Sequence, residues 1–254
     1  MRVLAILNIK GGVGKTATAV NLGFLAAQSG LRTLIWDLDP QGAASFYLRV
    51  KPKIRGGGKK LIRAKLDIDA LIKGSDYEGL DLLPADFSYR KMDIALDGIE
   101  KPKRQLGRLI DPLSADYDLA LLDCPPGMTL VLESVLAAAE GILVPTIPTI
   151  LSIRTLDQLA RHLQKKGPRK LAVLPFFSMV DRRRTLHREI VDGDREGPFR
   201  FLKTSIPYSS TVEKMGVHRK PLGAFSPRSR AALAYRALWA EVTQRVFDSG
   251  GDAA

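Results

Sequence analysis

Apolar and polar positions along the chain follow two alternating patterns. Short apolar runs typical of strands cover residues 2–9, 32–37, 80–84, 117–124, 141–146, 170–179 and 199–206. Apolar residues at helical spacing cover 16–29, 87–98, 104–113, 129–139, 152–166, 182–192, 209–215 and 228–247. Strands that alternate with helices of this length indicate βαβ units. The pattern therefore predicts an α/β fold with a mostly parallel, twisted sheet and helices on both faces.

A glycine-rich segment links the first strand pattern to the first helical pattern. It reads Lys10-Gly11-Gly12-Val13-Gly14-Lys15-Thr16. In a phosphate-binding loop, glycines turn backbone N–H groups toward an anion, a lysine neutralises the outer phosphates and a Ser/Thr hydroxyl holds magnesium. The order strand, loop, helix would place phosphates at a helix N-terminus, which favours anions. One nucleotide rarely needs two lysines, so Lys10 indicates a charge directed at another phosphate.

Carboxylates follow two of the other predicted strands. Asp37 and Asp39 lie at the C-terminal end of the second strand and just past it, and their i, i+2 spacing points them the same way. Two such carboxylates could hold a magnesium ion and orient a water molecule. Alternatively, Asp39 and Pro40 could simply begin a helix. Asp123 ends the fourth strand after four apolar residues, a position suited to magnesium coordination through water.

Length and charge narrow the class of protein. The 254 residues suit one α/β domain, residues 1–254, and the single cysteine, Cys124, excludes internal disulfides and suggests buried packing. The net charge is +12. Residues 161–245 hold 19 Lys+Arg against 7 Asp+Glu, whereas residues 1–160 hold 20 against 18. This excess in one part of the chain favours a polyanionic partner over a merely solubilising surface.

Residues 51–65 form a second basic stretch, with seven basic residues and no acid. We expect a mobile surface insertion here. A binding role and a solvated loop are equally compatible with its composition.

The three motifs together carry a family resemblance. KGGVGKT, DLDPQG and LLDCPPG, in this order, resemble the ParA/MinD group of P-loop ATPases, whose deviant Walker A loop has a signature lysine. The resemblance extends over nearly the whole chain, through Val144-Pro145-Thr146 and the segment from Ile206-Pro207 to Tyr235. It is closest to short ParA-type partitioning ATPases, because no helix-turn-helix precedes the loop.

The resemblance implies an ATP hydrolase with weak intrinsic activity that uses ATP and Mg²⁺ and dimerises when ATP binds. By position, Lys10 would reach the partner's nucleotide, Lys15 would bind the chain's own phosphates and Asp39 would position the attacking water. Thr16 and Asp123 would hold magnesium, with Asp37 assisting. The nucleotide contacts would come from the backbone and side chains of Lys10, Gly11, Gly12, Val13, Gly14, Lys15, Thr16, Ala17 and Pro207.

Two positions depart from the family pattern. Ala17 stands where many relatives have a second hydroxyl for the α-phosphate, which predicts slightly weaker nucleotide affinity. Ser178 stands where some relatives have an asparagine at the adenine. We expect a backbone contact to the purine near Pro207.

The branch of the group follows from what the chain contains. A membrane-associated, MinD-like ATPase is the alternative, but it would end in a basic amphipathic tail, whereas the residues after Phe247 are acidic and Gly-rich. Leu233, Leu238, Val242 and Val246 are expected to dock the last helix on the core. Cys124 alone cannot ligate an iron–sulfur cluster, and a metabolic synthetase would not need the basic C-terminal third.

We therefore predict a cytoplasmic, nucleoid-associated ATPase that forms an ATP-dependent homodimer. The dimer is expected to bind double-stranded DNA non-specifically and not to bind a membrane. A ParB-like adaptor would stimulate hydrolysis, and the cargo would be a plasmid, a chromosome or a protein assembly. The candidate DNA contacts are Arg182, Arg183, Arg184, Arg188, Lys203, Arg219, Lys220, Arg228 and Arg230.

Overall fold

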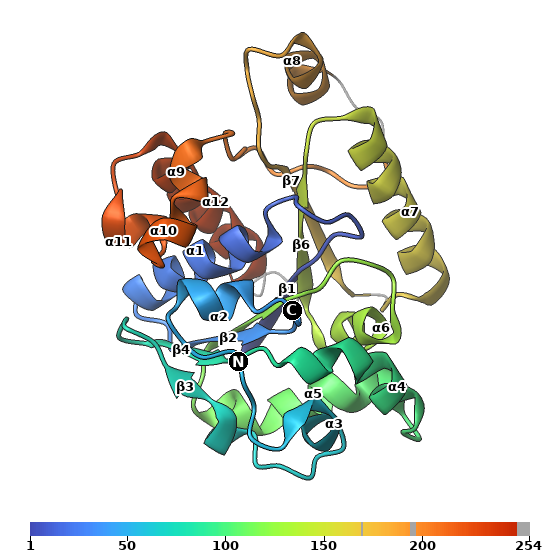
Figure 1. Ribbon diagram of the computed structural model, residues 1–254. Coiled ribbons are helices and arrows are strands. Elements are labelled where there is room, and N and C mark those ends of the chain that lie inside the picture. The colour runs from blue at the N-terminus through green and yellow to red at the C-terminus, as the bar shows by residue number, and fades with distance from the viewer. Residues whose placement is uncertain (169, 194–196, 248–254) are drawn as a thin grey trace, which may run out of the picture.

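A computed structural model describes residues 1–168, 170–193 and 197–247 of the chain (Figure 1). The acidic, Gly-rich tail predicted after Phe247 lies outside the described residues.

A seven-stranded sheet forms the centre of the described part of the molecule, in the order β3-β4-β2-β5-β1-β6-β7. Six strands are parallel, and the short edge strand β3 is antiparallel to β4. The bounds are β1 (Arg2–Ile6), β2 (Thr33–Asp37), β3 (Lys73–Gly74), β4 (Leu80–Leu83), β5 (Leu119–Asp123), β6 (Gly141–Thr146) and β7 (Ala172–Phe177). The predicted α/β class is confirmed.

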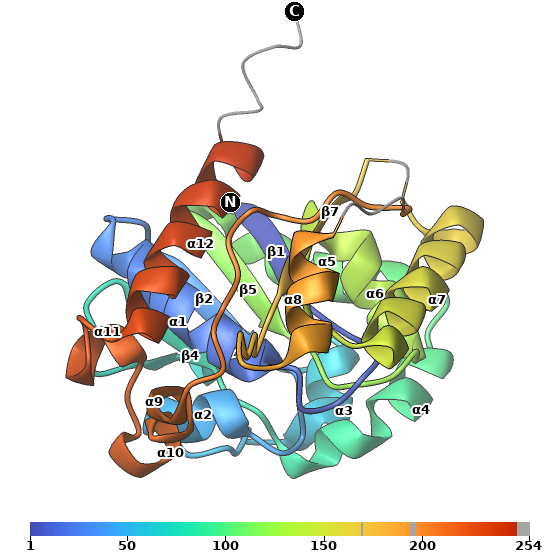
Figure 2. The same ribbon diagram turned by 90° about the horizontal axis from the view of Figure 1, so that it is seen from above.

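Helices cover both faces of the sheet (Figure 2). One layer holds α1 (Lys15–Gln28), α2 (Ala43–Tyr47), α9 (Ser210–Glu213), α10 (Met215–His218), α11 (Leu222–Phe225) and α12 (Arg230–Val246). The other holds α3 (Gly57–Ile62), α4 (Met92–Asp97), α5 (Gln105–Ile110), α6 (Leu130–Ala138) and α7 (Ile150–Lys166). Helix α8 (Thr185–Asp192) follows β7. The 3₁₀ turns are η1 (Asp69–Leu71), η2 (Phe87–Lys91), η3 (Pro102–Arg104) and η4 (Asp111–Ala115).

Alternation along the central strands supplies both halves of the core. On β1, Leu4 and Ile6 pack toward the α1 layer, and Val3 and Ala5 pack toward the α6 layer. The nearly continuous apolar run at the start of the chain therefore forms a strand that is buried on both faces. This arrangement fixes the carboxyl ends of β1, β2 and β5 side by side, where ligands bind in such sheets.

The prediction of a strand over residues 199–206 is wrong, because the structure forms no strand in this segment. Its backbone reaches β7 through two bonds, from the Leu202 N–H to the Pro175 oxygen and from the Ile206 N–H to the Phe177 oxygen, each 2.8 Å. Between them, the amides of Lys203 and Thr204 donate to the carboxylate of Glu241 on α12. Because a side chain accepts these donors, the ladder does not continue.

The mobile surface insertion predicted at 51–65 is also wrong, because this segment contains α3 and contributes to the core. Ile54, Leu61 and Ile62 are buried. The amide of Gly58 donates to the Ser88 hydroxyl at 2.7 Å, which fixes α3 against η2. The basic side chains of the segment are exposed, as its composition predicts. The composition did not indicate that the apolar side chains of the same segment are buried.

The last helix docks largely as predicted. Leu238 and Val242 are fully buried and Val246 is half-buried, but Leu233 is 50% exposed, so its predicted place in the core is wrong. Helix α12 packs against α1. Within the described residues, no helix has both the length and the apolar character needed to cross a membrane.

Candidate functional site

The loop between β1 and α1 is held open by glycine geometry and by one asparagine. Gly12 and Gly14 have φ values of 70° and 93°, in the region that favours glycine. The buried Asn8 donates from Nδ2 to the Pro145 oxygen at 2.8 Å and accepts the Lys10 amide at 2.9 Å. The loop is therefore anchored to the end of β6. Gly14 precedes α1 without a side-chain cap, which leaves the helix N-terminus open to an anion.

The two loop lysines occupy different environments. Lys15 is only 7% exposed, and its Nζ donates to the Lys10 carbonyl at 3.3 Å. Burial lowers the pKa of Lys15, while Asp123, Cys124 and Asp39 raise it. Lys10 is exposed, and its ammonium makes no hydrogen bond or ion pair with the described residues. Lys15 thus faces inward and Lys10 faces solvent.

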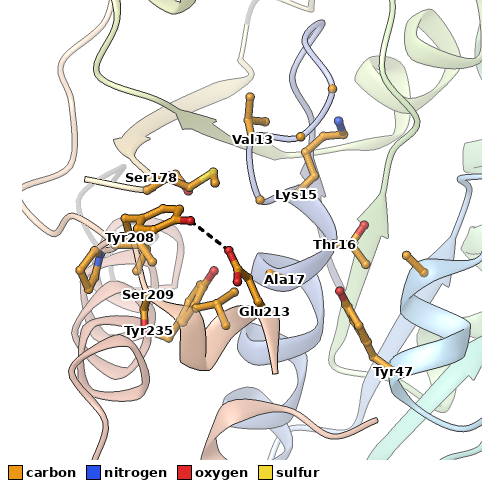
Figure 3. Close-up of a pocket in the computed structure, with 18 of the residues that line it drawn as sticks. Val13, Lys15, Thr16, Ala17, Tyr47, Ser178, Tyr208, Ser209, Glu213 and Tyr235 are labelled. Atoms are coloured by element: carbon orange, nitrogen blue, oxygen red, sulfur yellow. Dashed lines mark hydrogen bonds between the residues drawn. The ribbon is translucent and has the colours of Figure 1, made fainter. Parts of the chain in front are cut away.

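A cavity of about 330 Å³ lies beside this loop. Figure 3 shows Lys15 and Thr16 at the start of α1, and Tyr208, Glu213 and Tyr235 across the cavity. The predicted nucleotide residues on its wall are Gly11, Gly12, Val13, Gly14, Lys15, Thr16, Ala17 and Pro207, and Asp39 and Ser178 also line it. Lys10 does not line the cavity. The volume suits a small ligand, with a phosphate loop at one end and aromatic side chains at the other.

Two fully buried carboxylates lie at the sheet edge behind the loop. Asp37 and Asp123 are register partners on the neighbouring parallel strands β2 and β5. Burial raises the pKa of Asp123 well above its ordinary value, and the charge of Asp37 raises it further, whereas the positive charge of Lys15 lowers it. Burial also raises the pKa of Asp37 to about 6, against two hydrogen bonds from Ser45. Such an arrangement is costly without a cation.

The residues fit a magnesium ion. Both oxygens of Asp123 and Oδ1 of Asp37 are buried without a hydrogen-bond partner among the described residues. Magnesium usually takes one or two carboxylates together with substrate phosphates and waters. It therefore needs no larger cluster, and the described residues contain no group of three or more His, Cys, Asp or Glu side chains that could hold a metal.

Asp39 lies at the cavity itself, in the turn between β2 and α2. Its Oδ1 accepts the Gln41 amide at 2.9 Å, and its carbonyl accepts the Gly42 amide. The carboxylate is partly exposed, unlike that of Asp37. The sequence placed these two acids together, and the structure gives them separate surroundings.

Cys124 follows Asp123 and is buried, as its apolar context predicts. Burial raises the pKa of its thiol far above the ordinary value. The side chain therefore serves packing rather than reactivity.

Three of the candidate DNA contacts share one groove of about 850 Å³, which is lined by Arg182, Arg183 and Arg230. Asp181, also on the groove, pairs with Arg183 at 2.9 Å. Pro207 lines both this groove and the first cavity. The basic groove and the candidate nucleotide cavity are therefore neighbours.

The remaining candidate contacts are more dispersed. Arg184 lies 3.8 Å from Asp181, and Arg188 donates to the Arg182 carbonyl at 3.0 Å. Arg219 is held elsewhere, with its guanidinium 4.6 Å from the Phe46 ring centre on α2. The others lie on separate segments of the C-terminal third, with Lys203 and Arg228 exposed and Lys220 half-buried.

Several residues of the site were not predicted from the sequence. Tyr47, Tyr235 and Glu213 line the cavity, and Ser45 bonds to Asp37. Tyr208 stands next to Pro207 in the chain, and this adjacency was the one available signal. The others come from α2, α9 and α12, which only the folded chain brings to the cavity.

Comparisons with known proteins place the chain in a family. The model of a family described as AAA domain matches residues 1–171. The sporulation initiation inhibitor protein Soj of Bacillus subtilis is 32% identical over 248 residues, covering 95% of this chain and 98% of Soj. The chromosome partitioning protein ParA of Caulobacter vibrioides is 30% identical over 264 residues, covering 100% of this chain and 98% of that protein.

A solved structure agrees with the fold. Cobyrinic acid a,c-diamide synthase from Mycobacterium smegmatis, with bound ADP and magnesium, superposes with a TM-score of 0.82 and 28% identity, covering 98% of this chain and 96% of that one. The resemblance predicted from the three motifs is thus confirmed. The chain belongs to the ParA/MinD family of P-loop ATPases, enzymes that hydrolyse ATP.

Proposed function

We propose that the chain binds ATP with magnesium in the cavity beside the loop and hydrolyses it as part of a cycle that positions a cargo. The inward Lys15 and the backbone N–H groups of residues 11–16 would hold the phosphates. The base would lie toward Pro207 and Ser178, which line the same cavity. Ala17 offers no hydroxyl there.

Magnesium would be held by Thr16 and Asp123, with Asp37 beside them. The unpaired oxygens of the two buried carboxylates support this assignment. When bound, the ion would neutralise charge on the phosphate oxygens. Asp39, partly exposed on the cavity wall, would orient the attacking water.

The single observation that carries the wider proposal is the exposure of Lys10. Its backbone is fixed on both sides, by Asn8 at the amide and by Lys15 at the carbonyl. Its side chain is nevertheless exposed and does not line the cavity, whereas Lys15 does. The Lys10 backbone is fixed at the phosphate loop, and its ammonium group faces solvent. It could therefore bind the phosphates of a nucleotide held by a second subunit. The proposed active form is therefore a homodimer that sandwiches two ATP molecules.

The proposed dimer binds double-stranded DNA without sequence preference. The groove formed by Arg182, Arg183 and Arg230 supports this, because it adjoins the cavity through Pro207. Arginines that contact phosphates bind any duplex, and their affinity falls steeply with salt. Two weak sites joined in one dimer bind far more tightly than either alone.

A cargo-linked adaptor would stimulate hydrolysis, open the dimer and release DNA. The similarity to Soj and to Caulobacter ParA, named as a chromosome partitioning protein, supports this role in a nucleoid-associated, cytoplasmic protein. The cargo would be a plasmid, a chromosome or a protein assembly.

The test is retention on random-sequence duplex DNA, measured with ATP and with ADP over a series of salt concentrations. We expect retention with ATP and magnesium only, lost as salt rises and equal on duplexes of different sequence. Binding to anionic lipid vesicles with ATP, without retention on DNA, would instead support the membrane-associated alternative. ATP consumption coupled to amidation of a carboxylate substrate would support a synthetase.

A further inference from the structure

A buried serine connects α2 to the carboxylate pair at the sheet edge. Ser45 is fully buried, and both its amide and its hydroxyl donate to Oδ2 of Asp37, at 2.8 and 2.7 Å. The Ser45 Oγ in turn accepts the amide of Ala85, just after β4, at 3.0 Å. One side chain therefore joins three segments that are distant in the sequence.

The direction of the hydroxyl proton follows from these partners. A backbone N–H can only donate, so Ser45 Oγ must be the acceptor toward Ala85. Its own proton is then free for Asp37, whose Oδ2 lies 2.7 Å away. Ala85 thus orients Ser45, and Ser45 orients the carboxylate.

This bonding makes the two oxygens of Asp37 unequal. Oδ2 accepts two hydrogen bonds from Ser45, whereas Oδ1 is buried without a hydrogen-bond partner among the described residues. Asp123 stands opposite Asp37 in the register, and both of its oxygens are unpartnered in the same sense. Ser45 therefore anchors one oxygen of Asp37 and leaves the other without a hydrogen-bond partner among the described residues.

The same contact also frames Asp39. The turn from Asp39 to Gly42 lies between Asp37, which ends β2, and α2, which carries Ser45. The Asp39 carbonyl and carboxylate accept the amides of Gly42 and Gln41, both at 2.9 Å. Because Asp37 and Ser45 are bonded directly, both ends of this turn are fixed.

We propose that Ser45 is a positioning residue of the ATPase site, which holds Asp37 so that its free oxygen serves the magnesium ion. This inference rests on the proposed function, since it requires magnesium at Asp37 and Asp123. Ser45 itself touches neither nucleotide nor metal in this scheme. Groups that orient metal ligands change metal affinity by about 10- to 100-fold when removed.

A matched control is present in the same molecule. Ser134 on α6 is also fully buried, and its Oγ accepts the amide of Leu106 on α5 at 3.1 Å, with no hydrogen bond to Asp37 or Asp123. Ser134→Ala leaves a buried amide without its acceptor, as Ser45→Ala does at Ala85. The two variants therefore share the general cost of losing a buried hydroxyl, and only one of them affects Asp37.

The experiment measures ADP binding to the full chain by calorimetry, in EDTA and over a magnesium series. The readout is the magnesium concentration that gives half of the gain in ADP affinity. We expect Ser45→Ala to raise this concentration about tenfold or more, with ADP affinity in EDTA unchanged. Ser45→Thr, which keeps the hydroxyl, and Ser134→Ala should behave as the wild type. Thermal melts establish that each variant is folded.

Two results would overturn the inference. Ser45→Ala could show the wild-type magnesium dependence, or Ser134→Ala could shift it equally, which would indicate a general effect of destabilisation. The proposed function fails in a different way: the wild type itself would bind no ADP, or would bind it without any gain from magnesium.

Discussion

Asp37→Asn should stabilise the metal-free protein at neutral pH while it weakens the response to magnesium. The carboxylate is fully buried beside Asp123, so its negative charge is unfavourable when no cation is present. Asparagine has nearly the same shape, and its side-chain oxygen can still accept the bonds from Ser45. The substitution therefore removes the charge and preserves the packing.

The size of the effect follows from the pKa. Burial raises the pKa of Asp37 from 3.8 to about 6. This corresponds to about 3 kcal/mol at neutral pH, because each pKa unit is worth about 1.4 kcal/mol. The pKa of Asp37 is higher in the folded state than in the unfolded state. The folded wild type therefore keeps its full stability below about pH 3.8, where the carboxyl is protonated, and loses about 3 kcal/mol as pH rises from 3.8 to about 6. For a chain of this length, the gain in melting temperature for Asp37→Asn would be roughly 6–12 °C.

Thermal melts of wild type and Asp37→Asn in EDTA, from pH 4 to 8, measure this directly. We expect the two melting temperatures to converge near pH 4, to separate as pH rises from 4 to about 6, and to differ by a constant amount above pH 6, with the variant higher. The exposed Asp97→Asn is the control and should follow the wild type throughout. A variant that melts at or below the wild type at pH 7.5, or a difference that does not depend on pH, would refute the reasoning.

Three further substitutions separate binding, hydrolysis and DNA contact. Lys15→Ala should abolish nucleotide binding measured by calorimetry, because it removes the buried cation of the loop; retained affinity would contradict this role. Asp39→Ala should bind ATP, hydrolyse it slowly and remain on DNA; a normal hydrolysis rate would show that the catalytic assignment is wrong. Arg228→Glu with Arg230→Glu should weaken binding to every duplex and lower the salt dependence by about one per lost phosphate contact. ATPase activity without DNA should stay near normal, and strong sequence dependence would contradict phosphate contact.

The glycine loop and the acids at the strand ends were predictable because these features are local in sequence. A glycine loop between a strand and a helix, and acids at the ends of two strands, are set by short-range patterns. Parallel pairing then brings Asp37 and Asp123 into register. The structure adds what patterns do not contain, namely that Asp37 is anchored by Ser45 and that Asp39 stays partly exposed.

The errors have a common cause, since in each one a tertiary contact overrides the local pattern. Residues 199–206 look like a strand, but Glu241 on α12 accepts two of the amides that a ladder would use. Residues 51–65 look like a solvated loop because basic residues dominate. The buried Ile54, Leu61 and Ile62 nevertheless fix that segment against the neighbouring helices.

The central claim is that Lys10 couples nucleotide to dimer and dimer to DNA. The most direct test is sedimentation of Lys10→Ala with ATP, magnesium and random duplex DNA, with Lys73→Ala as the control, an exposed lysine on the edge strand β3. We predict that Lys10→Ala binds ATP as the wild type does but sediments as a monomer and leaves the DNA free, while Lys73→Ala dimerises and binds. Normal ATP-dependent dimerisation of Lys10→Ala would contradict the account.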